Sequence, residues 1–101
     1  MTYTIYQVKN TSECDKYRFA NVRDLSANSL EISRGNYDRI YTGDIEDHGQ
    51  GHELMLEYLF TCFNMKRPDD FRGHSMSVSD VVELDGQAFY CNSFSWVPIE
   101  F

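Results

Sequence analysis

The sequence holds little that would mark a membrane protein, a secreted protein or a chain of several domains. Only two of its 101 residues are proline, and it contains no repeat or low-complexity stretch that could serve as a linker. The longest dense apolar run, residues 54–63, is too short to cross a bilayer and contains Glu57. The first residues alternate like a strand and lack the blocks of a signal peptide. We therefore expect one cytoplasmic domain spanning residues 1–101.

Cysteine and the common catalytic motifs are equally scarce. The three cysteines, Cys14, Cys62 and Cys91, form no CxxC pair and no even framework, so we expect free thiols in a reducing compartment. The motifs GxxxxGK[ST], GxGxxG and GxSxG are missing. Nothing in the sequence therefore supports an enzyme, and we predict that the protein is not one.

A metal site is suggested only weakly, by two pairs of neighbouring residues. Asp47-His48 and His52-Glu53 could supply ligands, but the glycines at 49 and 51 break the helix that would place both imidazoles on one face. We predict no metal and no cofactor.

Basic residues are missing from one long segment. The net charge is −7, with eleven acidic and three basic residues in 43–101 against five and six in 1–42. Between Arg39 and Lys66 there is no Lys or Arg, and the acidic residues of this segment are Asp44, Glu46, Asp47, Glu53 and Glu57. Such a chain repels phosphate backbones, so we expect no direct nucleic-acid binding, whereas a basic protein surface would attract it. Acidity of this kind also serves solubility alone.

The hydrophobic pattern predicts an α+β fold. Alternating β-branched and aromatic residues predict strands at 2–8, 37–42, 77–84, 87–92 and 94–99. Asp85-Gly86 is a strong hairpin signal that sets Leu84 opposite Gln87, and Pro98 marks the last strand as an edge. Helices are predicted around 22–28 and from 51 or 52 to 64. We expect an antiparallel sheet of four to five strands, one main helix packed on a face and a second short helix.

The main helix is apolar around most of its circumference. Its polar residues form one narrow stripe, with spacings of four, four and three: Glu53, Glu57, Thr61 and Asn64. A helix of this kind must be covered on several sides. We favour a helix that lies across the sheet under long loops over one that offers part of its surface to a partner.

Asp80 breaks the alternation of its predicted strand. Period two places it on the same face as Val82 and Leu84, where a carboxylate needs a partner. The candidates just upstream are Arg72 and His74. We favour an internal ion pair that holds the 65–75 loop against the sheet over a catalytic or ligand-binding carboxylate.

Three segments resemble YodL-like domains. Residues 70–82, DFRGHSMSVSDVV, resemble the family signature DFRGHSLSVSDVV, residues 34–43, RGNYDRIYTG, resemble its R-x-N-Y-[DE]-x-[VI]-Y segment, and residues 90–94, YCNSF, resemble its YYxDSFGF ending. The chain departs from the pattern at Met76, at Cys91-Asn92 and in the longer loop and helix at 44–64. The resemblance covers nearly the whole chain. We expect its central motif to serve the fold, through Asp70, Arg72, Gly73, His74 and Asp80.

The resemblance also implies a function. The family is carried largely by phages, plasmids and conjugative elements of low-GC Gram-positive bacteria, and it has no established catalysis. Small acidic members are similar to anti-CRISPR proteins that act on type II-A effector nucleases. The resemblance thus implies a protein that binds such an RNA-guided nuclease and interferes with guide-RNA loading. We separately expect a monomer or weak homodimer. The predicted binding surface consists of Asp44, Glu46, Asp47, Glu53 and Glu57.

Other functions remain open at this point. The name-giving member of the family suggests a regulator of host cytoskeletal or cell-shape proteins, and an anti-restriction module is a further alternative. A small hydrolase that uses Asp80 and His74 is the weakest of them.

Overall fold

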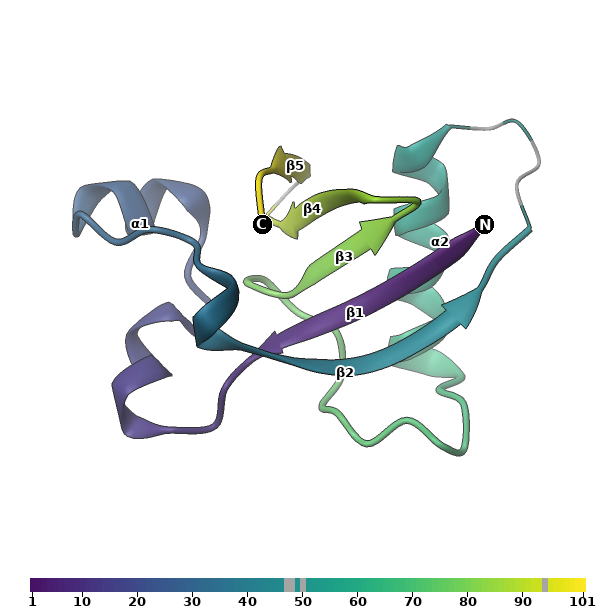
Figure 1. Cartoon of the computed structure of the whole chain (residues 1–101), viewed down its shortest axis with the longest axis horizontal. Helices are drawn as coiled ribbons and strands as arrows, with labels where there is room; N and C mark the ends of the chain where they lie inside the picture. Colours follow the sequence, from purple (N-terminus) through teal and green to yellow (C-terminus); the bar gives the residue numbers. More distant parts are fainter. Residues whose placement is uncertain (47–48, 50, 94) are drawn as a thin grey trace.

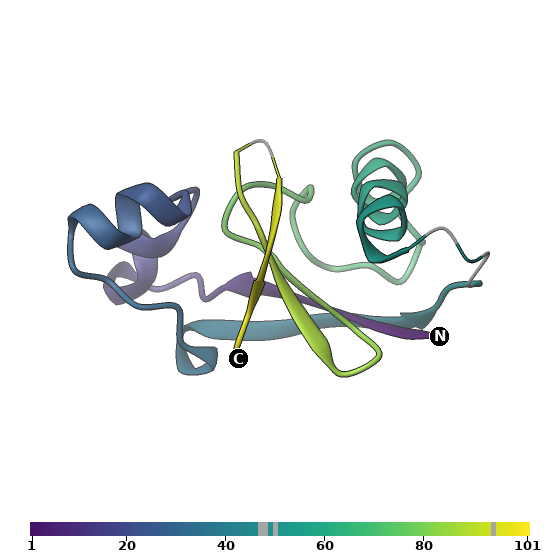
Figure 2. The ribbon, with the colours of Figure 1, turned by 90° about the horizontal axis from the view of Figure 1, so that it is seen from above.

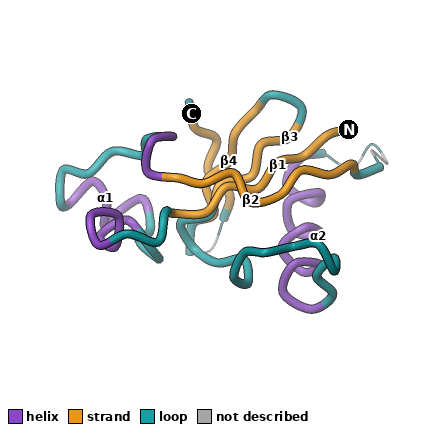
Figure 3. Tube along the Cα trace, turned by 60° about the horizontal axis from the view of Figure 1, so that its bottom comes forward, coloured by secondary structure: helices purple, strands orange, loops and turns teal. Residues whose placement is uncertain are grey.

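The chain folds into one antiparallel sheet with helical segments around it (Figure 1). The computed structural model describes residues 1–46, 49, 51–93 and 95–101. Figure 3 colours helices, strands and loops differently. In chain order, the elements are β1 (Thr2–Val8), the 3-10 helix η1 (Ser12–Tyr17), α1 (Val22–Ala27), the 3-10 helix η2 (Arg34–Asn36), β2 (Tyr37–Asp44), α2 (His52–Met65), β3 (Val81–Leu84), β4 (Gln87–Cys91) and β5 (Trp96–Ile99).

The sheet has the order β2-β1-β3-β4-β5, which confirms the predicted antiparallel sheet and places β2 and β5 at its edges. The hairpin between β3 and β4 has the predicted register, with Leu84 opposite Gln87 and Val82 opposite Phe89. Its turn residues, Asp85 and Gly86, have φ angles of 48° and 87°, the left-handed conformation that a two-residue hairpin turn requires.

Both faces of the sheet are covered, each by a different cluster of side chains. On β1, Tyr3 and Ile5 face one cluster while Tyr6 and Val8 face the other, as the period of two requires. The second cluster also contains Leu25 of α1. The helices α1 and α2 lie toward opposite ends of the molecule, as Figure 2 also shows from above.

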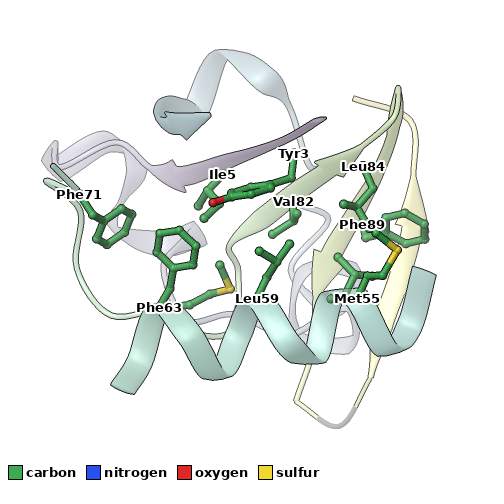
Figure 4. Close-up of a cluster of buried hydrophobic side chains, with 11 residues drawn as sticks. Tyr3, Ile5, Met55, Leu59, Phe63, Phe71, Val82, Leu84 and Phe89 are labelled. Carbon is green, nitrogen blue, oxygen red and sulfur yellow. The ribbon is translucent and has the colours of Figure 1, made fainter. Parts of the chain in front are cut away.

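Helix α2 lies across the first face of the sheet, as predicted (Figure 4). Met55, Leu56, Leu59 and Phe63 are its buried residues. The ring of His52 packs edge-on against Phe89 of β4, with 5.3 Å between ring centroids. At the other end, Phe63 packs against Tyr41 of β2 at 5.5 Å. The helix therefore runs from the β4 side of the sheet to the β2 side. Among the described residues, no helix is long and apolar enough to span a bilayer.

Two expectations about these elements are wrong in part. Strand β3 begins at Val81 rather than at residue 77, because Ser79 has a φ angle of 86° and the Asp80 N–H donates to the Ser77 carbonyl, which makes a turn. Loops also fail to cover the outer side of α2, where Leu54, Tyr58 and Met65 are 56%, 60% and 80% exposed.

We expect Phe63→Ala to lower the free energy of unfolding by about 3–5 kcal/mol, because the ring is 1% exposed and packs edge-on against Tyr3, Tyr41 and Phe71. Urea denaturation measures this change. The matched control is Phe19→Ala, since Phe19 is 62% exposed and should change stability by about 0.5 kcal/mol or less. Equal losses in the two variants would contradict the packing of α2.

Candidate functional site

Two of the predicted acidic residues lie together on the outer side of α2. Glu53 is in the first turn of the helix and Glu57 follows one turn later, both exposed. The helix dipole stabilises the Glu53 anion at this position. The Glu57 carboxylate accepts a hydrogen bond of 3.1 Å from the indole nitrogen of Trp96 in β5. This contact fixes one carboxylate oxygen and holds the side chain toward the β5 edge of the sheet.

The other predicted acidic residues follow β2. Asp44 is the last residue of the strand, is exposed, and accepts a hydrogen bond of 3.2 Å from the Thr2 hydroxyl. Glu46 is exposed two residues later. Asp47 lies outside the described residues, as does His48, so the structure says nothing of these two positions.

The structure does not bring Asp44 and Glu57 together. Asp44 belongs to one edge strand, whereas Glu57 contacts the opposite edge strand, and three strands lie between them. Four strand spacings amount to about 19 Å. Charges so far apart are screened from each other, since the Debye length is about 8 Å at physiological ionic strength. The acidic residues on α2 therefore act separately from those at the end of β2. Exposed apolar side chains lie beside the α2 residues, Glu53 and Glu57.

Sequence reasoning missed an apolar stripe on α2. Leu54, Tyr58, Thr61 and Met65 follow at spacings of four, three and four, which places them on one side of the helix. Of the four large apolar side chains that are exposed in the described part of the chain, three belong to this stripe. The spacing was visible in the sequence, but the sequence does not tell which side of a nearly all-apolar helix faces the sheet.

The family-like motif at 70–82 serves the fold through Gln7 of β1. The side chain of Gln7 is buried, and its Oε1 accepts from the His74 N–H at 3.2 Å. Its Nε2 donates to the His74 carbonyl at 2.9 Å and to Asp80 Oδ2 at 3.0 Å. One amide therefore ties the loop before β3 to the middle of the sheet. We call these contacts the Gln7 clamp.

Two more residues of the 70–82 motif, Gly73 and Phe71, have structural roles next to the Gln7 clamp. A Cβ atom at Gly73 would lie 2.3 Å from Gln7 Oε1 and 2.7 Å from Ile40 Cγ2, so this position has no room for a side chain. Phe71 is buried and packs edge-on against Phe63 of α2 at 4.9 Å. The loop thus reaches both the sheet and the helix.

The expected partners of Asp80 are wrong. Asp80 is fully buried, as predicted, but Oδ2 accepts from Gln7 and from the Ser77 N–H at 2.9 Å. Arg72 is exposed and donates to the Asp69 carbonyl. His74 is exposed, and its imidazole Nδ1 lies 3.3 Å from the Gln7 amide nitrogen. A neutral amide therefore takes the place of the predicted cation.

Asp70, the first residue of the motif, is not part of the Gln7 clamp. It is exposed, and it lies close enough to Tyr41 to add to the effect of burial in raising the pKa of that hydroxyl.

Burial raises the pKa of Asp80 to about 7, even though the Ser77 N–H and Gln7 favour the anion. Its second oxygen, Oδ1, has no hydrogen-bond partner among the described residues, which adds to the cost of the charge. Asp80 and His74 do not form a catalytic pair here, because Gln7 lies between them and Asp80 is fully buried.

The other candidate chemical groups are poorly placed too. Burial raises the pKa of the Cys91 thiol to about 12, so it stays protonated at neutral pH and is a poor nucleophile. In the described ranges, no three His, Cys, Asp or Glu side chains gather as metal ligands would. The outer side of α2, with its exposed carboxylates and exposed apolar side chains, is the candidate site that we consider further.

We expect Asp80→Asn to be tolerated and to remove a pH dependence of stability. The folded pKa of about 7 exceeds the ordinary value of 3.8, so the contribution of Asp80 to stability is fully present below about pH 4, falls as the pH rises from about 4 to 7, and is lost above pH 7. The asparagine variant lacks this loss, and it should gain on the wild type by on the order of 2–4 kcal/mol between pH 4 and 8. Urea denaturation across this range measures the difference. Parallel stability curves for the two proteins would refute the buried, protonatable carboxyl.

The comparisons with known proteins give one match. The model of the YodL-like domain family matches residues 2–101. No curated protein and no solved structure matches the chain. Because the match runs through β1 with its Gln7, the 70–82 motif and all five strands, the chain belongs to the YodL-like domain family.

Proposed function

We propose that the protein is an anti-CRISPR inhibitor that binds a type II-A RNA-guided nuclease and blocks guide-RNA loading. The observation that carries the proposal is the outer side of α2, where Glu53 and Glu57 are exposed beside exposed apolar side chains. The partner is suggested by the resemblance of the chain to small acidic proteins of this family.

The charge of α2 supports a basic partner. No Lys or Arg lies between Arg39 and Lys66, so no cation of the preceding segment or of the helix itself offsets the two carboxylates. The guide channel of an RNA-guided nuclease is strongly basic, because it holds the phosphate backbone of the guide. An acidic surface is attracted to such a channel and competes with RNA for it.

Glu57 is the better placed of the two carboxylates. Its hydrogen bond to Trp96 holds the side chain in one position, so less conformational entropy is lost when it pairs with an arginine or lysine. Among the described residues, its second carboxylate oxygen accepts no hydrogen bond, which leaves it for that pair. Exposed charges of this kind mainly set the association rate and its salt dependence.

Competition for the channel predicts a dependence on the order of addition. The protein should prevent guide RNA from binding when it is mixed first with the apo nuclease, and it should inhibit a preloaded complex poorly, because the guide already occupies the surface. A guide-RNA binding assay with both orders of addition measures this. Inhibition should weaken as ionic strength rises.

The matched variants test the surface. Reversing both charges, Glu53→Lys with Glu57→Lys, should weaken the block of guide loading by about tenfold or more. Glu13→Lys is the control, since Glu13 is exposed in η1, away from α2. Equal inhibition in both orders of addition, or full inhibition by the double α2 variant, would reject the proposal.

A further inference from the structure

The exposed stripe of α2 has the spacing of a helix–helix contact. Leu54, Tyr58, Thr61 and Met65 alternate at four and three residues, the pattern by which a helix presents a continuous seam to a second helix. We call these four residues the α2 seam. The inner side of α2 is already used, since Leu56, Leu59 and Phe63 pack on the sheet. The seam is a second, outward side of the same helix.

Thr61 does not interrupt the apolar character of the seam. Its hydroxyl donates to the Glu57 carbonyl one turn earlier, at 3.0 Å. The polar group is therefore satisfied within the helix, and the methyl group remains for a contact.

We propose that the α2 seam binds a basic amphipathic helix of the partner protein. The apolar side of that helix packs on Leu54, Tyr58 and Met65, and its lysines or arginines face Glu53 and Glu57 along one side of the seam. This inference rests on the proposed function only in that the partner presents a basic protein surface. The further claim is that the α2 seam recognises a helix on that basic surface.

Charge and size argue against a second copy as the occupant. Two copies would bring together two chains with a net charge of −7 each. The seam also presents only four residues, whereas a stable dimer interface of standard size uses about 20–30 residues a side. A short helical segment of opposite charge matches both the length and the charge of the seam.

The test uses two synthetic peptides and the purified protein. The first peptide is an 18-residue helix with leucines on one side and lysines on the others. The second has the same composition, but its leucines are distributed around the helix. The wild type should bind the first peptide about tenfold or more tightly than the second, by fluorescence anisotropy. Equal binding of the two peptides would show electrostatic attraction alone and overturn the proposal.

Variants locate the contact. The double variant Tyr58→Ser with Met65→Ser should bind the first peptide about tenfold more weakly, since exposed anchors carry most of the binding energy of such contacts. Phe19→Ser is the control, because Phe19 is exposed to the same extent, 62% against 60% for Tyr58, but lies outside α2. Equal weakening by the control, or a wild-type dimer that the double variant abolishes in sedimentation velocity, would overturn the proposal.

The two proposals fail separately. Peptide binding through the seam without any block of guide loading would reject the nuclease as the target and leave the binding mode in place. A block of guide loading that the seam variant retains in full would reject the binding mode and leave the target in place.

Discussion

The buried amide of Gln7 holds the structure together at the point where the chain has no regular secondary structure. Residues 66–80 connect α2 to β3 without a helix or strand, and their backbone groups still need partners. Gln7 supplies both a donor and an acceptor to His74 and a second donor contact to Asp80. Because Gln7 is 2% exposed on β1, an interior strand, the loop is held against a buried part of the sheet.

This interaction gives the most recognisable motif of the chain a structural role. Gly73 has no room for a side chain, Phe71 packs on α2, and Asp80 is fully buried. The motif residues are thus used to place the loop and, through Phe71, the helix. The exposed carboxylates and apolar side chains of the proposed binding surface lie elsewhere, on the outer side of α2. The motif thus serves the fold, and we propose that the exposed residues of α2 determine what this member of the family binds.

Much of the fold could be predicted from local patterns. The alternation in β1, the Asp85-Gly86 turn and the apolar density of α2 are signals within a few residues, and the strand pairings follow from them. The start of β3 could not be predicted, because Ser79 takes a left-handed φ angle that only the surrounding contacts enforce: its hydroxyl accepts from the Phe19 N–H and its carbonyl from the Tyr37 hydroxyl.

The candidate site was harder to predict, because it depends on contacts between distant residues. The side-chain partner of Asp80, Gln7, is 73 positions away in the sequence, so the expectation based on nearby Arg72 and His74 was wrong. The five acidic residues are close in sequence, but the sheet separates Asp44 from Glu57. The exposed seam depends on which side of α2 meets the sheet, and that is fixed by the packing of Phe63 and Leu59.

The central claim is that the outer side of α2 binds the partner while the motif region only builds the fold. Hydroxyl-radical footprinting of side chains tests it directly, because Tyr58, Met65 and Phe19 are all exposed and oxidisable in the free protein. With the apo nuclease in excess, the account predicts that Tyr58 and Met65 become protected while Phe19, which lies against His74 of the motif, keeps its reactivity. Protection of Phe19 with Tyr58 and Met65 unchanged would contradict it.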